Sequence, residues 1–295
     1  MLGRFLIAIT FMFAPLASAE PLRVVTSIAP LQGLVADIME GVGKPTLLLG
    51  EAVSAHDFAM RPSQAKAISG ADIIFYVGQN MEPWLEKALK SRNKSGETIA
   101  LGDIVTLARL DTRELDEFGE HRADHDDEGL YDPHFWLNPD NALVWLDSIS
   151  SVLAIADPDN EDTYQANLKR TKQDIIQAIA NIKRDLAPVS GLDLVVTHDS
   201  TQYFENAFDL NVIGAFSASD GQTAGARNLH RLLAKLGPNS CIVEDISHPN
   251  RFTASIPDSV NHVFIDPMGY GTLGVSGFYP KLLSNLAQSL LACRD

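Results

Sequence analysis

Residues 161–186 read EDTYQANLKRTKQDIIQAIANIKRDL, and they decide how the rest of the chain is organised. The apolar side chains of this stretch recur at helical spacing, while charged and polar side chains fill the other positions. These apolar residues are Leu168, Ile175, Ile176, Ile179, Ile182 and Leu186. Asp157-Pro158-Asp159 provides a start signal before the stretch, and Pro188 ends it. At about 1.5 Å per residue, one helix here would be roughly 39 Å long, enough to run the height of two domains.

Short apolar runs rich in β-branched residues lie on both sides of this helix and alternate with helical patterns. Such alternation is typical of βαβ units around a mainly parallel sheet. The runs form one cluster before the helix and one after it: Leu22–Ser27, Pro45–Gly50, Asp72–Gly78, Leu192–His198, Leu210–Phe216, Cys241–Ile246 and His262–Asp266. We therefore expect an α/β fold of two lobes, each with a central, mainly parallel sheet flanked by helices, joined by one long rigid helix. The expected N-terminal lobe is 20–158, the linking helix 159–187 and the C-terminal lobe 188–295.

The first 19 residues have the pattern of a cleavable secretory signal peptide. Arg4 supplies the positive charge, Phe5–Pro15 the apolar run, and Ala17-Ser18-Ala19 the cleavage site. The apolar run is too short to cross a bilayer comfortably, and no later run of that length is free of charge, so we expect no stable membrane insertion. Because no cysteine near the cleavage site offers a lipid attachment point, we expect a soluble periplasmic protein rather than a lipoprotein.

The charge balance of the chain favours cations as ligands. Without residues 1–19, the chain keeps 22 basic and 38 acidic side chains, a formal net charge of −16. Such a balance repels nucleic acid and anionic lipid head groups. We therefore expect no nucleic-acid partner.

One segment, residues 111–131, is strongly acidic. Nine of its residues are Asp or Glu, His121 and His125 are interspersed among them, and no apolar periodicity supports a packed element. We interpret the segment as a loop with two alternative roles. It is either a solvated linker or an auxiliary metal loop that collects cations and passes them to a main site.

The two cysteines, Cys241 and Cys293, both lie in the C-terminal third of the chain. In an oxidising compartment, such a pair favours a disulfide over a metal site. A bridge would close a loop of about fifty residues and connect a predicted strand to the end of the last helix. The alternative is a pair of free buried thiols.

Four candidate metal ligands occupy equivalent positions in the predicted fold. His56, His134 and His198 each lie where a predicted helix or strand gives way to a loop, and Asp266 lies at the end of a late strand. Crevices outside the carboxyl ends of strands are where open α/β sheets bind ligands. Three imidazoles and one carboxylate would fill the tetrahedral shell that zinc prefers. Since two of the four come from each lobe, we predict a metal ion between the lobes.

Three other histidines lie in predicted helices or at the predicted surface, and we do not interpret them as metal ligands. A lone histidine is more often an ordinary core or surface residue than a metal ligand. We interpret His230, His248 and His262 in that way, because none of them has a matching partner in the sequence pattern.

Several motifs of the chain resemble those of the zinc-binding members of the metal-specific solute-binding proteins of ABC transporters (cluster A-I). The similar segments cover nearly the whole mature chain: His56-Asp57-Phe58, Arg61-Pro62-Ser63, Ala71-Asp72-Ile73-Ile74, Gly78, Glu82-Pro83-Trp84-Leu85, Asp132-Pro133-His134-Phe135-Trp136-Leu137, Thr197-His198-Asp199, Tyr203-Phe204, Val243-Glu244 and Asp266-Pro267. The resemblance implies two α/β lobes joined by one long helix. It also implies a disulfide in the C-terminal lobe and an acidic loop that carries histidines.

The resemblance implies a transport function and no enzymatic activity. A protein of this family captures Zn²⁺ as cargo in the periplasm and delivers it to an inner-membrane ABC permease. We expect a monomer, with a periplasmic zinc chaperone as a further candidate partner. The long helix limits hinge motion, so we expect metal release through loop rearrangement near His134 and the acidic segment.

The resemblance assigns the metal ligands as His56, His134, His198 and Asp266. Glu82, Glu244 or a water molecule are alternatives for the fourth position. Manganese and iron carriers of this family place a carboxylate at the third position, whereas His198 supplies nitrogen and so favours zinc. Two departures are visible: Ala55 stands where some zinc binders carry an acidic residue, and the acidic segment has only two histidines.

Three further functions are compatible with the sequence. A manganese- or iron-binding protein of the same family differs only in its cargo. A zinc hydrolase would leave the fourth position open for an activated water and would use Glu244 or Asp266 as general base. An adhesion or scaffold protein of the same fold would hold a structural metal instead.

Overall fold

The computed structural model describes residues 20–50, 55–56, 58–92, 96–113, 131–217, 226–248, 256–257 and 259–294. The expected signal peptide lies outside the described residues, as does most of the acidic segment with His121 and His125. Within the described part of the chain, no helix combines the length and the apolar character needed to cross a membrane.

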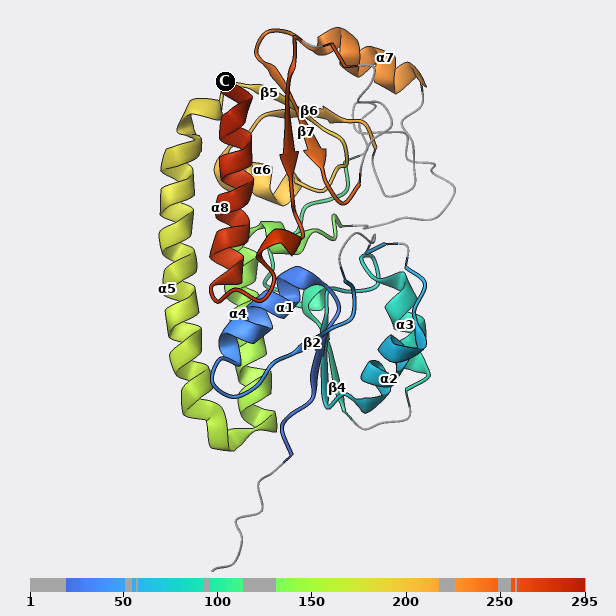
Figure 1. Ribbon diagram of the computed structural model, residues 1–295, viewed down its shortest axis with the longest axis vertical. Coiled ribbons are helices and arrows are strands. Elements are labelled where there is room, and N and C mark those ends of the chain that lie inside the picture. Colours follow the sequence, from blue (N-terminus) through green and yellow to red (C-terminus); the bar gives the residue numbers. More distant parts are fainter. Residues whose placement is uncertain are drawn as a thin grey trace, which may run out of the picture.

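The N-terminal lobe is built on four parallel strands in the order β2-β1-β3-β4 (Figure 1). The strands are β1 (Val24–Thr26), β2 (Thr46–Leu47), β3 (Ile73–Tyr76) and β4 (Glu97–Ala100), and the connecting helices are α1 (Ala29–Ile38), α2 (Pro62–Gly70) and α3 (Pro83–Lys90). Successive residues of β3 pack on opposite faces: Ile73 and Phe75 join the main core, while Ile74 and Tyr76 join the cluster under α2 and α3. Because both faces are covered, β1 and β3 are buried along their whole length.

The C-terminal lobe repeats this plan with the strand order β6-β5-β7-β8, again all parallel. Its strands are β5 (Asp193–Val196), β6 (Val212–Ala215), β7 (Ser240–Asp245) and β8 (Asn261–Ile265), and its helices are α6 (Gln202–Phe208), α7 (Ala226–Lys235) and α8 (Phe278–Leu291). Short 3₁₀ turns complete the chain: η1 (Leu101–Asp103), η3 (Phe135–Leu137), η4 (Pro158–Asn160), η5 (Ala187–Val189), η7 (Tyr270–Thr272) and η8 (Ala292–Arg294). The expected α/β fold with two parallel sheets is confirmed.

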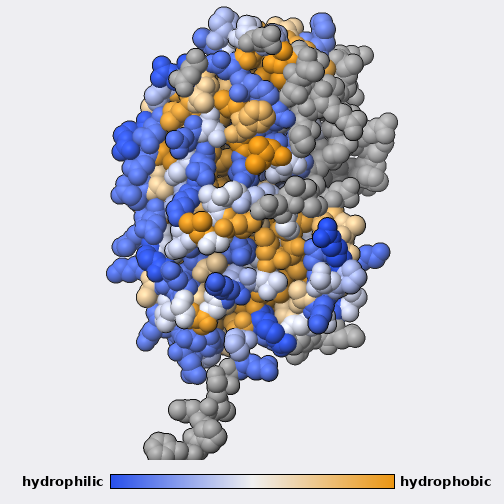
Figure 2. Space-filling model, viewed as in Figure 1, coloured by the Kyte–Doolittle hydropathy of each residue, from blue (hydrophilic) through white to orange (hydrophobic). Residues whose placement is uncertain are grey.

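The predicted linking helix is confirmed as α5 (Glu161–Leu186), a single helix of 26 residues that runs along both lobes (Figure 1). Its buried side chains recur every three or four residues: Tyr164, Asn167, Thr171, Ile175, Ala178, Ile182 and Leu186. This face packs on α1, α8 and α4 (Pro139–Ala156). The opposite face is polar, and Figure 2 shows hydrophilic side chains along the edge where α5 lies. Ile176 is an exception to the predicted apolar face, because its place next to Ile175 leaves it 56% exposed.

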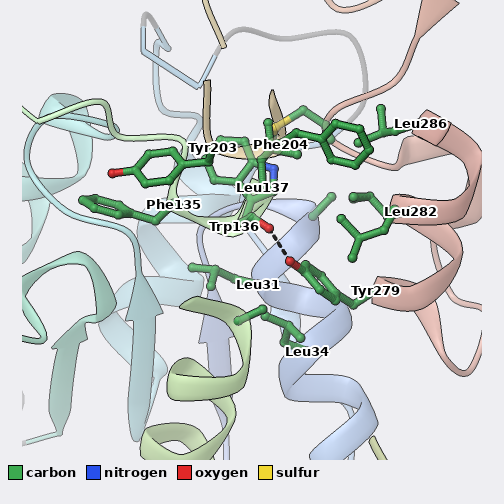
Figure 3. Packing of buried hydrophobic residues seen from close by; sticks show 14 of the residues in the cluster. Leu31, Leu34, Phe135, Trp136, Leu137, Tyr203, Phe204, Tyr279, Leu282 and Leu286 are labelled. Atoms are coloured by element: carbon green, nitrogen blue, oxygen red, sulfur yellow. Dashed lines mark hydrogen bonds between the residues drawn. The ribbon is translucent and has the colours of Figure 1, made fainter. Parts of the chain in front are cut away.

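The two lobes share one hydrophobic core. Figure 3 shows Leu31 and Leu34 of α1 beside Tyr279 and Leu282 of α8, with the aromatic residues around Trp136 between the lobes. The Trp136 indole N–H donates to the Pro267 carbonyl over 2.9 Å, and the Tyr279 hydroxyl donates to the Trp136 carbonyl over 2.5 Å. Buried apolar area and these buried hydrogen bonds therefore hold the lobes in one relative position.

One strand was not predicted from the sequence. β4 lies at the edge of its sheet, and its four residues, Glu97-Thr98-Ile99-Ala100, are exposed or only partly buried. An edge strand pairs with only one other strand and is less buried than a central strand. It therefore needs no continuous apolar run, which is the pattern that predicts the central strands. The predicted strands were also longer than the observed ones, because apolar residues continue into the adjoining turns.

Cys241 in β7 and Cys293 in η8 form a disulfide, which confirms the predicted pairing over the alternative of free thiols. Replacing both with alanine should lower the free energy of unfolding by about 4 kcal/mol, because the bridge closes a loop with a sequence separation of 52 residues. Urea unfolding of the oxidised protein and the double variant measures this difference. Reduction of the unsubstituted chain should reproduce the effect, and equal midpoints in all three samples would contradict it.

Glu82 is fully buried at the start of α3 and tunes stability through its protonation. Burial raises its pKa from an ordinary value of 4.5 to about 7, despite hydrogen bonds from Ser27 and from the Val77 and Gly78 amides. Between these two pH values only the folded chain holds the proton. Raising the pH through this window should therefore lower the free energy of unfolding, by about 3 kcal/mol in total.

Glu82→Gln removes this proton while it keeps a side chain of the same shape. Between pH 4.5 and 7, the free energy of unfolding of the variant should fall by about 3 kcal/mol less than that of the unsubstituted chain, as measured by denaturant unfolding. Glu97→Gln, at an exposed position of β4, is the control and should follow the unsubstituted chain. Equal slopes for all three proteins would contradict the assignment.

Candidate metal centre

Three histidines far apart in the sequence come together from both lobes: His56 after β2, His134 before η3, and His198 after β5. The Nε2 atoms of His56 and His134 are 3.5 Å apart, and one ring nitrogen from each of the three lies within 4.8 Å of the others. Nitrogen ligands of a tetrahedral zinc ion are roughly 3.3 Å apart, given bonds of about 2.0–2.1 Å. Small changes in the side-chain torsion angles would therefore bring the three ring nitrogens to the spacing that a zinc ion needs.

Local structure fixes the two histidines of the N-terminal lobe. The Trp84 indole donates to the Ala55 carbonyl over 2.8 Å and so anchors the residue before His56. On the other segment, the Asp132 carboxylate accepts the backbone N–H of His134 over 2.9 Å. Asn138 then caps α4 by accepting the Asp140 amide, which explains why the helix begins at this point.

His198 is fixed by the sheet of the C-terminal lobe. It follows β5 after one intervening residue, Thr197, and Asp199 N–H continues the ladder by donating to the Ser217 carbonyl over 3.0 Å. The His198 carbonyl accepts the Ser200 amide in a tight turn. As a result, the imidazole is only 4% exposed, similar to the 5% of His134.

Carboxylates stand behind two of the three imidazoles. His134 Nδ1 is 2.7 Å from Asp132 Oδ1, and His198 Nδ1 is 3.8 Å from Asp245 Oδ2. The first distance is a hydrogen bond, and the second is an ion-pair distance without one. A carboxylate at Nδ1 holds the proton there and leaves the Nε2 lone pair for a metal. His134 is thus oriented as metal ligands usually are, and Asp245 stands on the Nδ1 side of His198 at ion-pair distance.

Asp245 is held in its charged form. Burial alone would raise the pKa of this carboxyl, but the imidazoles of His198 and His248 outweigh burial and lower the pKa well below its usual range. His248 Nδ1 lies 3.1 Å from Asp245 Oδ2, and the Ser247 amide donates to Oδ1 over 2.8 Å. The contacts with the two imidazoles therefore favour the charged form of Asp245, whose negative charge attracts a cation.

The walls of the site are largely apolar. Met81, Trp136, Pro267 and Met268 line the pocket that also contains the three histidines. Trp136 packs edge-on against His134, with ring centroids 5.3 Å apart. Apolar walls lower the local dielectric, so charge and lone pairs inside the pocket interact more strongly than in water.

The predicted fourth ligand, Asp266, is not brought into this group. One of its oxygens accepts the Gly269 amide over 2.8 Å and the other accepts the Gly271 amide over 3.0 Å. Burial raises the pKa of this carboxyl, partly against these N–H donors. Among the described residues, the groups of close potential ligand atoms are His56–His134–His198 and His198–Asp245–His248, and Asp266 belongs to neither.

The two carboxylates predicted as substitutes for Asp266 also lie elsewhere. Glu82 accepts the hydrogen bonds described above, and Glu244 Oε2 lies 2.8 Å from His262 Nε2. Glu244 and Asp245 are neighbours in β7, and adjacent side chains of a strand point to opposite faces. This alternation explains why Asp245, rather than Glu244, faces the histidines.

Sequence reasoning missed Asp245 and His248. Asp245 had a usable signal, because it lies near the carboxyl end of a predicted strand, Cys241–Ile246, much as the other candidates do. His248 was interpreted as an ordinary surface residue, yet its ring centroid lies 4.7 Å from that of His198. No spacing pattern in the sequence connects residues 198 and 248, so only the fold reveals this contact.

The ends of the acidic segment are tied to the site. Asp111 and Tyr131 form an isolated antiparallel bridge, so the segment leaves and returns at one point. Arg113 forms ion pairs with Asp199 and Glu205 of the other lobe, and Asp199 is the residue after His198. The described ends of the segment therefore lie beside the histidines, while His121 and His125 fall outside the described residues.

Comparisons with known proteins agree with this geometry. The family model described as "Zinc-uptake complex component A periplasmic" (ZnuA) matches residues 24–293. The chain is 33% identical to the high-affinity zinc uptake system protein ZnuA of Yersinia pestis over 296 residues, which cover 94% of this chain and 92% of the relative. It is 30% identical to the protein of the same name from Brucella abortus over 304 residues, covering 92% and 91%.

A solved structure supports the same fold. The crystal structure of ZnuA superposes with a TM-score of 0.77 at 22% sequence identity, and the match covers 94% of this chain and 100% of that one. At this identity the likeness concerns the fold alone, whereas the family model extends over nearly all of the described residues. The chain therefore belongs to the ZnuA family of periplasmic zinc-uptake components.

Proposed function

We propose that the mature chain captures Zn²⁺ with high affinity in the periplasm and delivers it to an ABC-type zinc importer. The observation that carries this function is the convergence of three buried or half-buried imidazoles from two lobes on one point. Family membership and relatives named as high-affinity zinc uptake proteins support it. Zinc is cargo here, so the protein must bind it tightly and still release it.

His56, His134 and His198 are the proposed ligands, each through one ring nitrogen. Asp266 remains our prediction for the fourth ligand, and a water molecule is the alternative. Binding by Asp266 requires its carboxylate to turn from the amides of Gly269 and Gly271 towards the imidazoles. A water requires no such movement, and the polar side chains of the pocket, such as Ser200 and Ser247, are potential hydrogen-bond partners for it.

The donor set favours zinc over manganese and iron. Three neutral imidazoles suit zinc, whereas manganese prefers oxygen ligands such as carboxylates and water. Asp245 lies on the Nδ1 side of His198 and does not take the place of this imidazole as the third ligand. The site therefore suits a manganese- or iron-binding member of the same family less well.

A zinc hydrolase and a scaffold protein have less support than a zinc carrier. The family model describes a component of an uptake complex and not an enzyme. Glu244 and Asp266, the general bases that a hydrolase would need, point their carboxylates at His262 and at backbone amides. A scaffold with a structural metal would need the ion for folding, whereas in this chain a shared hydrophobic core joins the lobes.

The partners follow from the transport role. An inner-membrane ABC permease receives the zinc, and a periplasmic chaperone is a further candidate partner on the loading side. We propose that the protein acts as a monomer after its signal peptide, residues 1–19, has been removed. Because the lobes share one core, release proceeds by rearrangement of loops around His134 and the acidic segment rather than by wide lobe separation.

The acidic segment is proposed as an auxiliary loop that collects zinc through His121 and His125. Its described ends lie beside His198, held by the Asp111–Tyr131 bridge and by Arg113. A collector needs to be near the main site, which this placement satisfies. A solvated linker remains the alternative role.

Replacement of His134 tests the ligand assignment. His134→Ala should weaken zinc binding by more than about 100-fold, because loss of a direct ligand should exceed the 10- to 100-fold effect of its outer partners. Competition with a chelator of known affinity measures the change. His230→Ala, at an exposed position of α7, is the matched control and should bind like the unsubstituted chain. Unchanged affinity in His134→Ala would remove this residue from the ligand set.

Replacement of Asp132 tests the role of the carboxylate behind His134. Asp132→Ala removes the acceptor for both the Nδ1 proton and the backbone N–H of His134, so zinc affinity should fall by about 10- to 100-fold. Asp140→Ala, an exposed residue of the first turn of α4, serves as control. If both variants bind zinc equally well, orientation by Asp132 does not matter for binding.

A further inference from the structure

A second group of potential ligands adjoins the three histidines. His198, Asp245 and His248 each offer one ligand atom within 4.8 Å of the other two. All three line the same pocket as His56 and His134. His198 therefore belongs to both groups and is their point of contact.

Two of the distances within this second group are close to those between the ligand atoms of a zinc ion. Asp245 Oδ2 is 3.1 Å from His248 Nδ1 and 3.8 Å from His198 Nδ1. Ligand atoms of a tetrahedral zinc ion are roughly 3.3 Å apart, which lies between these two values. Two imidazoles and one carboxylate are also a donor set that protein zinc sites use.

We propose that His198, Asp245 and His248 form a second, outer zinc position, which the cation occupies on its way into or out of the three-histidine position. The proposal rests on zinc capture as the proposed function. The His248 side chain is 24% exposed, whereas His198 and Asp245 are buried, so the second position opens to solvent at His248. Zinc would enter this position at His248 before it reaches His198, which both positions share.

The shared imidazole makes the two positions alternatives. A neutral imidazole has a lone pair on one ring nitrogen and a proton on the other. His198 presents Nδ1 to Asp245 and the outer position, which leaves Nε2 for the inner one. When the ion moves from Nδ1 to the inner position, Nε2 releases its proton and Nδ1 takes one up, so the ring stays neutral and binds the ion through one nitrogen at a time. The two positions together therefore hold one zinc.

Variants without the inner position isolate the outer one. His56→Ala/His134→Ala keeps all three outer ligands and should still bind zinc, with lower affinity than the unsubstituted chain. Adding His248→Ala should weaken this residual binding by at least about tenfold, as loss of a ligand requires. Adding His230→Ala instead should leave it unchanged. Zinc held by His121 and His125 would not respond to His248→Ala, so the readout separates the two locations.

The outcomes distinguish this proposal from the proposed function. If the unsubstituted chain binds no zinc, the proposed function fails. If that chain binds zinc but His248→Ala leaves the residual affinity of the folded double variant unchanged, the outer position is wrong. The same conclusion follows if the double variant binds no more zinc than one that also lacks His198.

A second measurement keeps the inner position intact, in case the double variant does not fold. In an otherwise unsubstituted chain, His248→Ala should slow zinc transfer to a fast chelator at least about threefold. Without the outer position, zinc must dissociate from the three imidazoles directly, because no second set of ligands holds it on the way out. A transfer rate equal to those of the unsubstituted chain and His230→Ala would overturn the proposal.

Discussion

The fixed relation between the two lobes is the constraint on which the site depends. His134 and His198 come from different lobes, so their separation is only as constant as the packing between those lobes. Trp136 provides that packing directly: its indole bonds to Pro267, its carbonyl accepts from Tyr279, and its ring rests against His134. One buried aromatic residue thus joins the core to the metal-binding geometry. The long helix α5 supports the same relation from outside, since it packs against helices of both halves.

The carboxylates behind the imidazoles make this geometry chemically useful. A histidine that is merely close to others offers either ring nitrogen, and often a proton in place of a lone pair. Asp132 removes that ambiguity for His134, because it holds Nδ1 by a hydrogen bond and leaves Nε2 for the centre, and Asp245 faces the Nδ1 side of His198 at ion-pair distance. Asp245 also contributes negative charge deep in the pocket, where apolar side chains lower the local dielectric and so strengthen its attraction for a cation. The residues behind the imidazoles therefore contribute to the binding geometry as well as the imidazoles themselves.

A carrier needs both tight binding and a route for release. Lobes that share a continuous core do not separate easily, which is the reason for our proposal that loops around the pocket rearrange instead. The residues nearest those loops are His56, His248 and the described ends of the acidic segment. Arg113 links one of these ends to Asp199, next to His198. This ion pair joins a described end of the acidic segment to the residue beside a proposed ligand.

The sequence by itself determined the fold class, the linking helix, the disulfide pair and three of the residues that converge. These features have local or compositional signals. Central strands are marked by apolar runs, and α5 by apolar residues spaced three or four apart. The disulfide is indicated by two cysteines in an expected oxidising compartment, and the histidines by their positions at the ends of helices and strands. The edge strand β4 has no such signal, because its side chains are not buried. Only the tertiary structure decided which carboxylates stand beside the histidines. Asp266 turned to backbone amides, and Asp245 and His248 approached His198 instead. Contacts of this kind depend on the directions of side chains from separate strands and loops, which the order of residues along a chain does not encode locally.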